Sequence, residues 1–189
     1  MLIGVAVAAL WLGSHASAAE RCEIVPSVDI RDSTPVRTIN GDSVPARSVI
    51  AAASWIVRGK AISLDSAAKF AGVVATGVTF KVLEVLKAPD GASLKSFTVY
   101  GRLVNRDDFN RQPVPYWTVR PSGQTGGCFA REYRLGAQYL FFLMGVPDDG
   151  SLDPYWAPLL PTNEQIRGDD DAWLQWVRAR RDLKEPPRD

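Results

Sequence analysis

The stretch from Val78 to Lys87, VTFKVLEVLK, alternates between apolar and other side chains and changes phase once along its length. Three apolar residues share one parity and the next two share the other: Val78, Phe80 and Val82, then Leu83 and Val85. One extra residue in a β-bulge at Val82-Leu83 produces such a shift and curves the strand. Helical spacing also fits part of the segment, but its β-branched residues and the Pro-Asp-Gly turn at 89–91 favour a curved strand.

Further strands are predicted on both sides of this segment. Residues 54–62 alternate in the same way, and Gly59 marks a bend or a bulge within them. Residues 97–104 alternate again, with a kink expected at Gly101. Residues 137–144, AQYLFFLM, are apolar at nearly every position, which predicts a central strand covered on both faces.

The C-terminal part predicts one more strand and a helix. Residues 152–160 are expected to form the last strand, although two prolines interrupt it. The three aspartates at 169–171 are typical of a helix N-terminus, and the arginines that follow cluster where the helix dipole favours cations. We therefore expect a helix over 172–181 and a frayed tail over 182–189.

The remaining stretches are expected to be irregular. Residues 23–46 are rich in turn signals, and Asp65 is expected to cap a short turn over 66–70. Residues 105–127 form a loop of a length that is uncommon inside a compact domain and is often functional. Five to six bent strands and a C-terminal helix predict a mainly β fold, a closed or nearly closed β-barrel, in one domain over 22–181.

The composition excludes several classes of protein. The chain has 189 residues, 46% of them hydrophobic, and 22 Lys+Arg against 21 Asp+Glu give a formal net charge of +1. This balance gives no broad attraction to nucleic acid or to anionic lipid. Six Trp, five Tyr and seven Phe argue against intrinsic disorder, and no apolar run reaches the ~20 residues of a membrane-spanning helix. We expect a globular domain that binds no nucleic acid and has no stable membrane insertion.

The N-terminus predicts export. Residues 2–12, LIGVAVAALWL, are apolar without interruption, and Ala16-Ser17-Ala18 fits the small-x-small pattern of a signal-peptidase site. We expect a Sec-type signal peptide over 1–18, cleavage after Ala18 or Ala19, and a periplasmic or secreted protein. An uncleaved anchor is the alternative, but the apolar stretch is too short to cross ~30 Å of hydrocarbon as a helix.

Export also limits the chemistry of the chain. Cleavage removes His15, the only histidine, which excludes Ser-His-Asp and Cys-His catalysis and His-ligated zinc. Cys22 and Cys128 are the only cysteines, and an even pair in an exported chain is most simply a disulfide. Two free thiols are the alternative, but no histidine remains to form a thiolate. For a loop of about 100 residues the chain-entropy model assigns such a bridge up to ~4.7 kcal/mol.

Several stretches carry a family pattern: 53–62 (ASWIVRGKAI), 78–87, 127–129 (GCF) and 135–141 (LGAQYLF). Together they resemble the netrin-like module, which is the OB-fold barrel of the tissue inhibitors of metalloproteinases and is also found as bacterial TIMP-like proteins. The likeness covers about Cys22 to Met144. It implies an OB-fold-like barrel of five to six strands, and a disulfide from an early cysteine to one just before the Gly-x-x-Tyr-Leu strand, which are the positions of Cys22 and Cys128.

The resemblance also implies a protein-binding role, which in the best-known members is protease inhibition. In those members the mature N-terminus is the cysteine itself, whose α-amine and carbonyl chelate the protease zinc. Cleavage after Ala18 or Ala19 leaves two or three residues ahead of Cys22, and such an overhang would block that geometry. We expect a non-catalytic, disulfide-stapled binding module of the cell envelope that needs no cofactor and whose partner is another envelope or extracellular protein.

The expected contact surface is the loop over 105–127. It combines apolar area with hydrogen-bond donors in five residues: Phe109, Arg111, Tyr116, Trp117 and Arg120. The alternative is that Tyr116 and Trp117 only close the mouth of the barrel.

Two other functions fit weaker patterns. A carboxylate-dependent cell-wall hydrolase needs only Asp or Glu for its acid–base chemistry, with Glu84, Glu132 and Glu164 as candidates. Oligonucleotide binding would use a basic, aromatic face made of Tyr100, Arg102, Arg106, Arg131 and Arg134. The acidic stretches 148–153 and 169–171 lack the alternating spacing of a calcium loop, so we expect a turn, a helix N-cap and no metal site.

Overall fold

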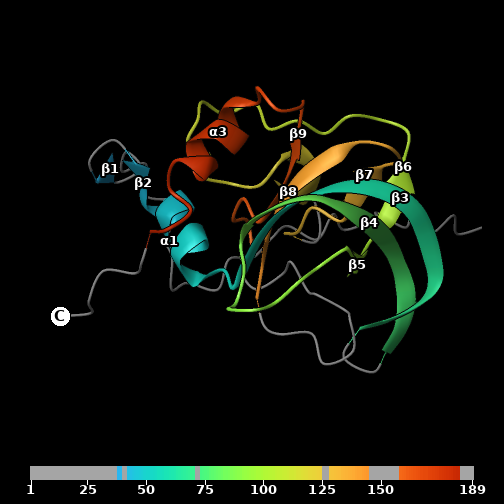
Figure 1. Cartoon of the computed structure of the whole chain (residues 1–189). Helices are drawn as coiled ribbons and strands as arrows, with labels where there is room; N and C mark the ends of the chain where they lie inside the picture. The colour runs from blue at the N-terminus through green and yellow to red at the C-terminus, as the bar shows by residue number, and fades with distance from the viewer. Residues whose placement is uncertain (1–37, 40–41, 71–72, 125–127, 145–157, 184–189) are drawn as a thin grey trace, which may run out of the picture.

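The computed structural model describes residues 38–39, 42–70, 73–124, 128–144 and 158–183. Its main strands are β3 (Trp55–Phe70), β4 (Val73–Lys87), β5 (Ser96–Tyr100), β8 (Gln138–Leu143) and β9 (Asn163–Ile166). They form a five-stranded antiparallel sheet in the order β5-β4-β3-β8-β9. Figure 1 shows this sheet curving round one side of the molecule, with helices α1 (Val44–Ala52) and α3 (Ala172–Arg178) on the other. The prediction of a mainly β fold is confirmed.

The β3–β4 ribbon has bulges at the positions that the sequence indicates. Val82 pairs with Gly59 and Glu84 pairs with Arg58, so Leu83 is the extra residue of the predicted bulge. A Cβ at Gly59 would lie 3.2 Å from the Cβ of Phe80, which is tighter than ordinary contact and explains the glycine.

The prediction of a capped turn over 66–70 is wrong. β3 continues to Phe70 and pairs with β4 beyond a further register shift between Asp65 and Ala68. The Asp65 side chain accepts a hydrogen bond from the Ala67 N–H at 2.9 Å, inside this irregularity rather than at a helical turn. Pairing with a long partner strand overrides the local capping preference.

Two short strands continue the chain beyond β5. β6 (Arg102–Val104) follows Gly101 and pairs in parallel with β7 (Glu132–Arg134). A Cβ at Gly101 would lie 2.5 Å from a backbone carbonyl oxygen just before β7, so the predicted kink is confirmed and requires glycine. Further along, Phe109 forms an isolated parallel bridge with Gln165 of β9, the strand at the opposite edge of the sheet.

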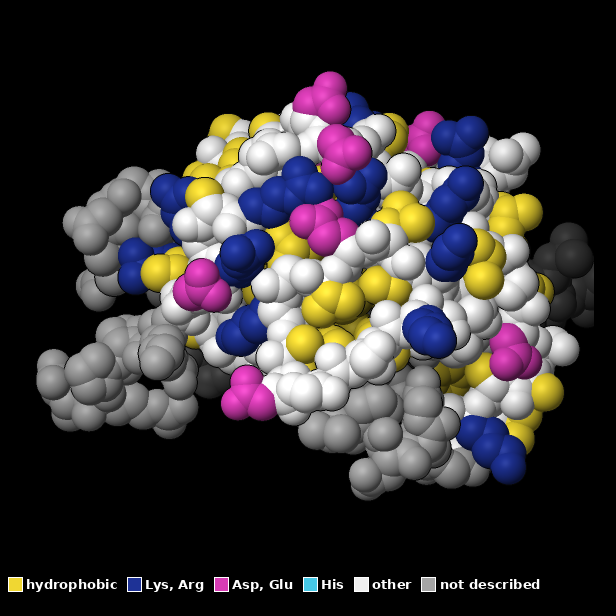
Figure 2. Space-filling model, viewed as in Figure 1, with side chains coloured by type: hydrophobic (Ala, Val, Ile, Leu, Met, Phe, Trp, Pro, Cys, Tyr) yellow, Lys and Arg dark blue, Asp and Glu magenta, His cyan; other side chains and the backbone are white. Residues whose placement is uncertain are grey.

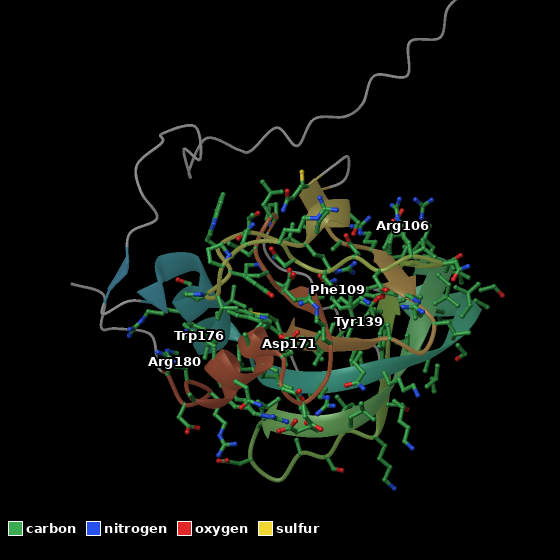
Figure 3. All side chains as sticks on the ribbon, turned by 90° about the horizontal axis from the view of Figure 1, so that it is seen from above. Arg106, Phe109, Tyr139, Asp171, Trp176 and Arg180 are labelled. Carbon is green, nitrogen blue, oxygen red and sulfur yellow. The ribbon has the colours of Figure 1, made fainter. Side chains whose placement is uncertain are left out.

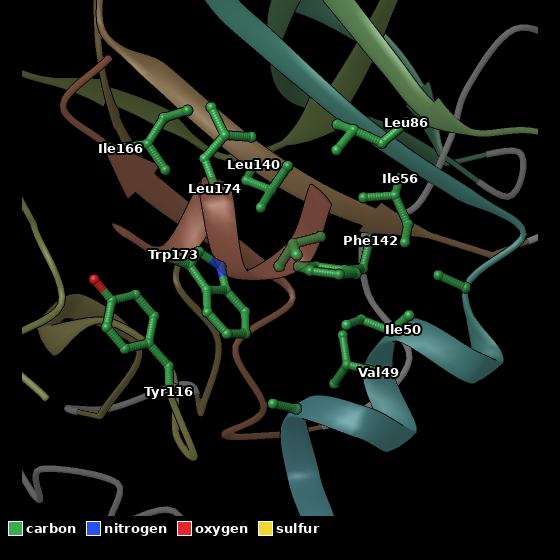
Figure 4. Packing of buried hydrophobic residues seen from close by; sticks show 13 residues of the cluster. Val49, Ile50, Ile56, Leu86, Tyr116, Leu140, Phe142, Ile166, Trp173 and Leu174 are labelled. Atoms are coloured by element: carbon green, nitrogen blue, oxygen red, sulfur yellow. The ribbon is translucent and has the colours of Figure 1, made fainter. Parts of the chain in front are cut away.

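The two faces of the sheet pack into separate apolar cores. One face carries an aromatic core that includes Phe80, Phe97, Tyr133, Tyr139 and Phe141. On the other face, Ile56, Leu140 and Phe142 pack against residues of the two helices, as Figure 4 shows: Val49 and Ile50 of α1, and Trp173 and Leu174 of α3. Alternate residues of β8 belong to different cores, so this strand is covered on both faces, as predicted.

Helix α3 is held in place by its cap and by ion pairs to the sheet. The Asp171 carboxylate accepts a hydrogen bond from the Trp173 N–H at 3.0 Å, which confirms the predicted N-cap. Arg178 donates to Glu84 of β4 at 2.5 Å, and Arg58 of β3 donates to Asp169 just before the helix. The helix ends at Arg178, three residues earlier than expected.

The last strand differs from the prediction. It lies at Asn163–Ile166, whereas residues 158–160 of the expected strand form a turn and 152–157 lie outside the described residues. β9 reads Asn-Glu-Gln-Ile, and all four residues are buried. A buried strand of polar residues has no apolar alternation, so its sequence resembles a loop.

Helix α1 begins inside the stretch that was expected to be irregular, because Ala46, Val49 and Ile50 share a helical face that the core covers. Just before it, β1 (Thr38–Ile39) and β2 (Asp42–Ser43) pair with each other. Across the described ranges, no helix combines the length and apolar character needed to cross a membrane. The predicted signal peptide, Cys22 and most of the predicted tail lie outside the described residues.

Candidate binding surface

The long loop after β6 lies across β9 and is fastened to it by side-chain hydrogen bonds. The Gln165 side chain accepts from the Asp108 N–H at 2.6 Å and donates to the Asp107 carboxylate at 2.6 Å. The Asn110 side chain donates to the Glu164 carboxylate at 3.0 Å. The polar residues of β9 therefore position the loop.

Arg120 is the centre of this polar network and is fully buried. Its guanidinium donates to the Asp108 carboxylate at 2.5 Å. It also donates to three backbone carbonyls, those of Ala130, Glu132 and Asn163. The rings of Tyr133 and Tyr139 lie 5.1 and 5.2 Å from its central carbon. These partners compensate a buried cation, so Arg120 joins the loop to the sheet from within.

Glu164 lies next to Arg120 and is also fully buried. Burial raises the pKa of Glu164 to about 7, although Arg120 and the hydrogen bond from Asn110 act in the opposite direction. A general acid needs such a pKa. However, the Glu164 oxygens accept from the Asn110 side chain and from the Arg120 N–H, and the residue does not line the cleft beside the loop. Its surroundings are those of a structural group.

The structure divides the five predicted contact residues into two groups. Tyr116 is buried and stacks on Trp173 of α3, with ring centroids 4.8 Å apart, and Arg120 is the buried centre described above. Phe109 is half-buried, whereas Arg111 and Trp117 are exposed. Only these last three residues present surface to a partner.

A cleft of about 790 Å³ opens beside the loop. Three of the predicted contact residues, Phe109, Arg111 and Tyr116, contribute to its wall, together with Arg106 after β6 and Arg167 after β9. The Arg167 guanidinium carbon lies 4.3 Å from the centroid of the Phe109 ring, within cation–π distance. The cleft therefore combines an aromatic surface with guanidinium groups from two segments of the chain, the loop and the residue after β9.

The three carboxylates considered for hydrolysis lie in separate surroundings. Glu84 pairs with Arg178, and Glu132 accepts hydrogen bonds from Arg102 and Arg106. Burial raises the pKa of Glu132, but these two arginines outweigh that effect and hold it below its ordinary value. Among the described clefts, none is lined by two of the three carboxylates.

The basic residues considered for oligonucleotide binding are divided between two depressions. Tyr100, Arg102 and Arg131 line one of about 480 Å³, where the Arg131 guanidinium lies 4.6 Å from the Tyr100 ring centroid. Arg106 lines the larger cleft, and Arg134 is paired with Asp107 at 2.7 Å. On the face in Figure 2, basic and acidic side chains are interspersed over much of the surface.

Cys128 lies between α2 (Pro121–Gln124) and β7, and its carbonyl accepts from the Leu159 N–H at 2.9 Å. Its pairing with Cys22 stays a prediction, since Cys22 is outside the described residues. Within those residues, no group of three or more His, Cys, Asp or Glu side chains could hold a metal ion. The acidic stretch 148–153 is also outside them.

Most residues of this site carry no sequence signal of their own. Asn110, Gln165 and Arg167 are ordinary polar residues in stretches without periodicity. The one usable signal is the combination of a very long loop with a polar run, Thr162 to Gln165, in place of the expected apolar strand. Their roles depend on partners from distant parts of the chain.

The fold and the site indicate only a broad class of protein, a mainly β domain whose long loop is held by a buried polar network. No family model and no curated protein matches the chain. The likeness to netrin-like modules therefore rests on the residues quoted above.

Proposed function

We propose that the chain is an exported, non-catalytic binding module of the cell envelope, and that its partner is another protein. One observation carries this proposal. The long loop is anchored by Arg120 and β9, and it leaves Arg111 and Trp117 exposed and Phe109 half-buried. A loop that is ordered before binding loses less conformational entropy on association. Aromatic and arginine side chains are also enriched among the residues that dominate binding energy.

We propose an OB-fold-like barrel of the netrin-like type as the architecture. The bulged β3–β4 ribbon supports it, since bulges curve a sheet toward closure. The parallel β6–β7 pair and the Phe109–Gln165 bridge support it as well, because they connect the end of β5 with the opposite edge strand. A barrel requires such contacts between its two edges.

The proposal includes a signal peptide over 1–18 and a disulfide between Cys22 and Cys128. Intact mass of the exported protein tests both, because it reports the processing site and the redox state. Alkylation without reductant is expected to leave both sulfur atoms unlabelled. Labelling of either sulfur in freshly exported protein would contradict the disulfide.

The zinc-chelating inhibition of metalloproteinases is not part of the proposal. That mechanism needs a cysteine at the mature N-terminus, whereas the proposed cleavage after Ala18 or Ala19 would leave two or three residues ahead of Cys22. The surface proposed above belongs to a different part of the chain and does not depend on a free α-amine.

The test compares two double variants of the mature protein as bait for envelope proteins. Trp117→Ala with Arg111→Ala removes an aromatic and a basic side chain from the outer side of the loop. Leu135→Ala with Lys81→Ala is the control, since it removes an exposed apolar and an exposed basic side chain elsewhere. A captured protein should bind the first variant at least about tenfold more weakly and the control unchanged.

Equal retention by both variants would contradict a contact surface on the loop. A separate assay tests the hydrolase alternative. The wild type and the variants Glu132→Gln and Glu164→Gln are each incubated with purified cell walls. Release of soluble fragments by the wild type, and not by variants of unchanged stability, would show catalysis instead of binding alone.

A further inference from the structure

Three arginines from two segments of the chain line the cleft beside the loop. Arg106 and Arg111 lie in the loop itself, and Arg167 follows β9. The side chains of Arg106 and Arg167 are 68% and 63% exposed, and Arg111 is exposed as well. Like charges that share a cleft repel each other unless anions balance them, so the acidic groups of the cleft decide what it can bind.

Each acidic residue of the cleft wall is paired with an arginine that does not line the cleft. Asp107 accepts from Arg134 at 2.7 Å and from Gln165 at 2.6 Å, and the hydrogen bond from Arg134 is the main cause that holds the pKa of Asp107 below its ordinary value. Asp108 is buried and pairs with Arg120 at 2.5 Å. In the described part of the chain, no ion pair joins either carboxylate to the three cleft arginines.

The three guanidinium groups keep donors for a ligand. Arg106 makes one hydrogen bond, to Glu132, and Arg167 lies over the Phe109 ring, 4.0 Å from the carboxylate that caps α3. Arg111 has no ion-pair partner among the described residues. Each guanidinium carries five N–H donors in a planar fork that matches a carboxylate in two-point contact.

The cleft is also large for a single small anion, with a volume of about 790 Å³. In Figure 3, Arg106, Phe109 and Asp171 follow one another across the molecule, and Arg167 approaches Asp171 at its far end. All but Asp171 line the same cleft. Guanidinium groups spread along a cleft fit a chain that bears several carboxylates better than they fit a single small anion.

We propose that this cleft binds an acidic segment of the partner protein, whose carboxylates are held by Arg106, Arg111 and Arg167 and whose backbone lies against Phe109. This inference rests on the proposed function and names the chemistry of the partner. Free phosphate or a free carboxylic acid offers the same anionic groups without the chain, so the test must distinguish these sources.

The first experiment measures the fluorescence anisotropy of a labelled oligo-glutamate peptide titrated with the mature protein. We expect saturable binding that weakens with added salt and that unlabelled oligo-glutamate reverses. Oligo-glutamine should not compete. Absence of saturable binding would overturn the proposal, and so would displacement by inorganic phosphate or free glutamate at the same molar concentration as the peptide.

The second experiment compares two variants with the same change in net charge. Arg111→Glu with Arg167→Glu reverses two cleft charges, whereas Lys81→Glu with Lys95→Glu reverses two exposed charges, one on β4 and one just before β5. We expect the cleft variant to bind the peptide at least about tenfold more weakly and the control less than about twofold more weakly. Equal losses would show non-specific attraction and overturn the proposal.

Arg111→Ala protects the comparison against misfolding, since this exposed side chain has no ion pair with the part of the chain that the structure describes. It should weaken peptide binding severalfold at an unchanged melting temperature, and unchanged binding would count against the cleft. The two proposals also fail separately. A partner captured through Trp117 by a protein that does not bind oligo-glutamate would leave the proposed function standing and reject the acidic segment.

Discussion

The aromatic core of the sheet and the polar network around Arg120 fill neighbouring parts of one interior by different means. In the aromatic core, the ring centroids of Phe80, Phe97 and Phe141 lie 4.7 to 5.4 Å apart in stacked and edge-to-face pairs, whose packing is less directional than hydrogen bonding. In the polar network, each group is placed by hydrogen bonds of defined geometry, such as Arg120 to Asp108 at 2.5 Å. The aromatic core stabilises the sheet, whereas the polar network determines where an irregular loop lies.

The largest effect is expected from Arg120→Met, which keeps an apolar stem but removes the cation. The free energy of unfolding should fall by about 3–5 kcal/mol, because Asp108 is left as a buried charge without its partner. Urea unfolding measures this. Asp108→Asn in the same chain should recover part of the loss, since the two residues act as a pair. A loss below that of an apolar core substitution would mean that the network does not organise the loop.

Next in size is the pH dependence that Glu164 confers on the same network. Its pKa is about 7 in the folded chain against 4.5 for the ordinary group, so the folded state holds the proton more tightly. Protonated Glu164 therefore stabilises the folded state. This stabilisation is fully present below about pH 4.5 and is lost as the pH rises through about 7, and it amounts to about 3 kcal/mol. Glu164→Gln should flatten the dependence of the unfolding free energy on pH across this interval.

Urea unfolding at a series of pH values between about 4.5 and 7.5 makes that measurement. The pKa of Asp107 and that of Glu132 are lowered, so these groups titrate at more acidic pH and do not obscure the interval. A slope that persists unchanged in the Glu164→Gln variant would assign the pH dependence to another group.

A smaller effect is expected from Phe141→Leu in the aromatic core. The substitution keeps an apolar side chain of somewhat smaller volume among rings that can adjust, so it should cost about 1–2 kcal/mol. Denaturant unfolding of this variant beside Arg120→Met tests the contrast directly. Comparable losses in the two variants would show that both parts of the interior depend equally on exact geometry.

The smallest effect on stability is expected from Trp117→Ala, at the outer side of the loop. The residue is 39% exposed and its backbone N–H, which the substitution keeps, donates to the Gln112 side chain, so the change should cost no more than about 1 kcal/mol. Tyr116→Ala is the matched comparison, because that ring is buried against Trp173 and should cost several times more. A strongly lowered melting temperature for Trp117→Ala would favour a residue that closes the barrel mouth.

The strands were predictable where apolar and other residues alternate, as at 78–87, and where glycine is required by close approach, as at Gly59 and Gly101. The cap at Asp171 was predictable because it acts within one turn. β9 was not, since three of its four buried residues are polar and find distant partners: Glu164 and Gln165 bond to the loop, and Asn163 donates to the Ala130 carbonyl and the Tyr133 hydroxyl. For the same reason, the sequence could not distinguish a buried Arg120 from an Arg120 exposed for contact with a partner.

Sequence alone therefore determined β4, β5, β8 and the first part of β3, the bulge beside Val82 and the start of the last helix, because these depend on side-chain order within a few residues. Tertiary structure alone decided which polar residues face inward and which arginines share a cleft. The free energy of burying a charge or an amide depends on the partners that meet it, and those partners come from segments far apart in the chain.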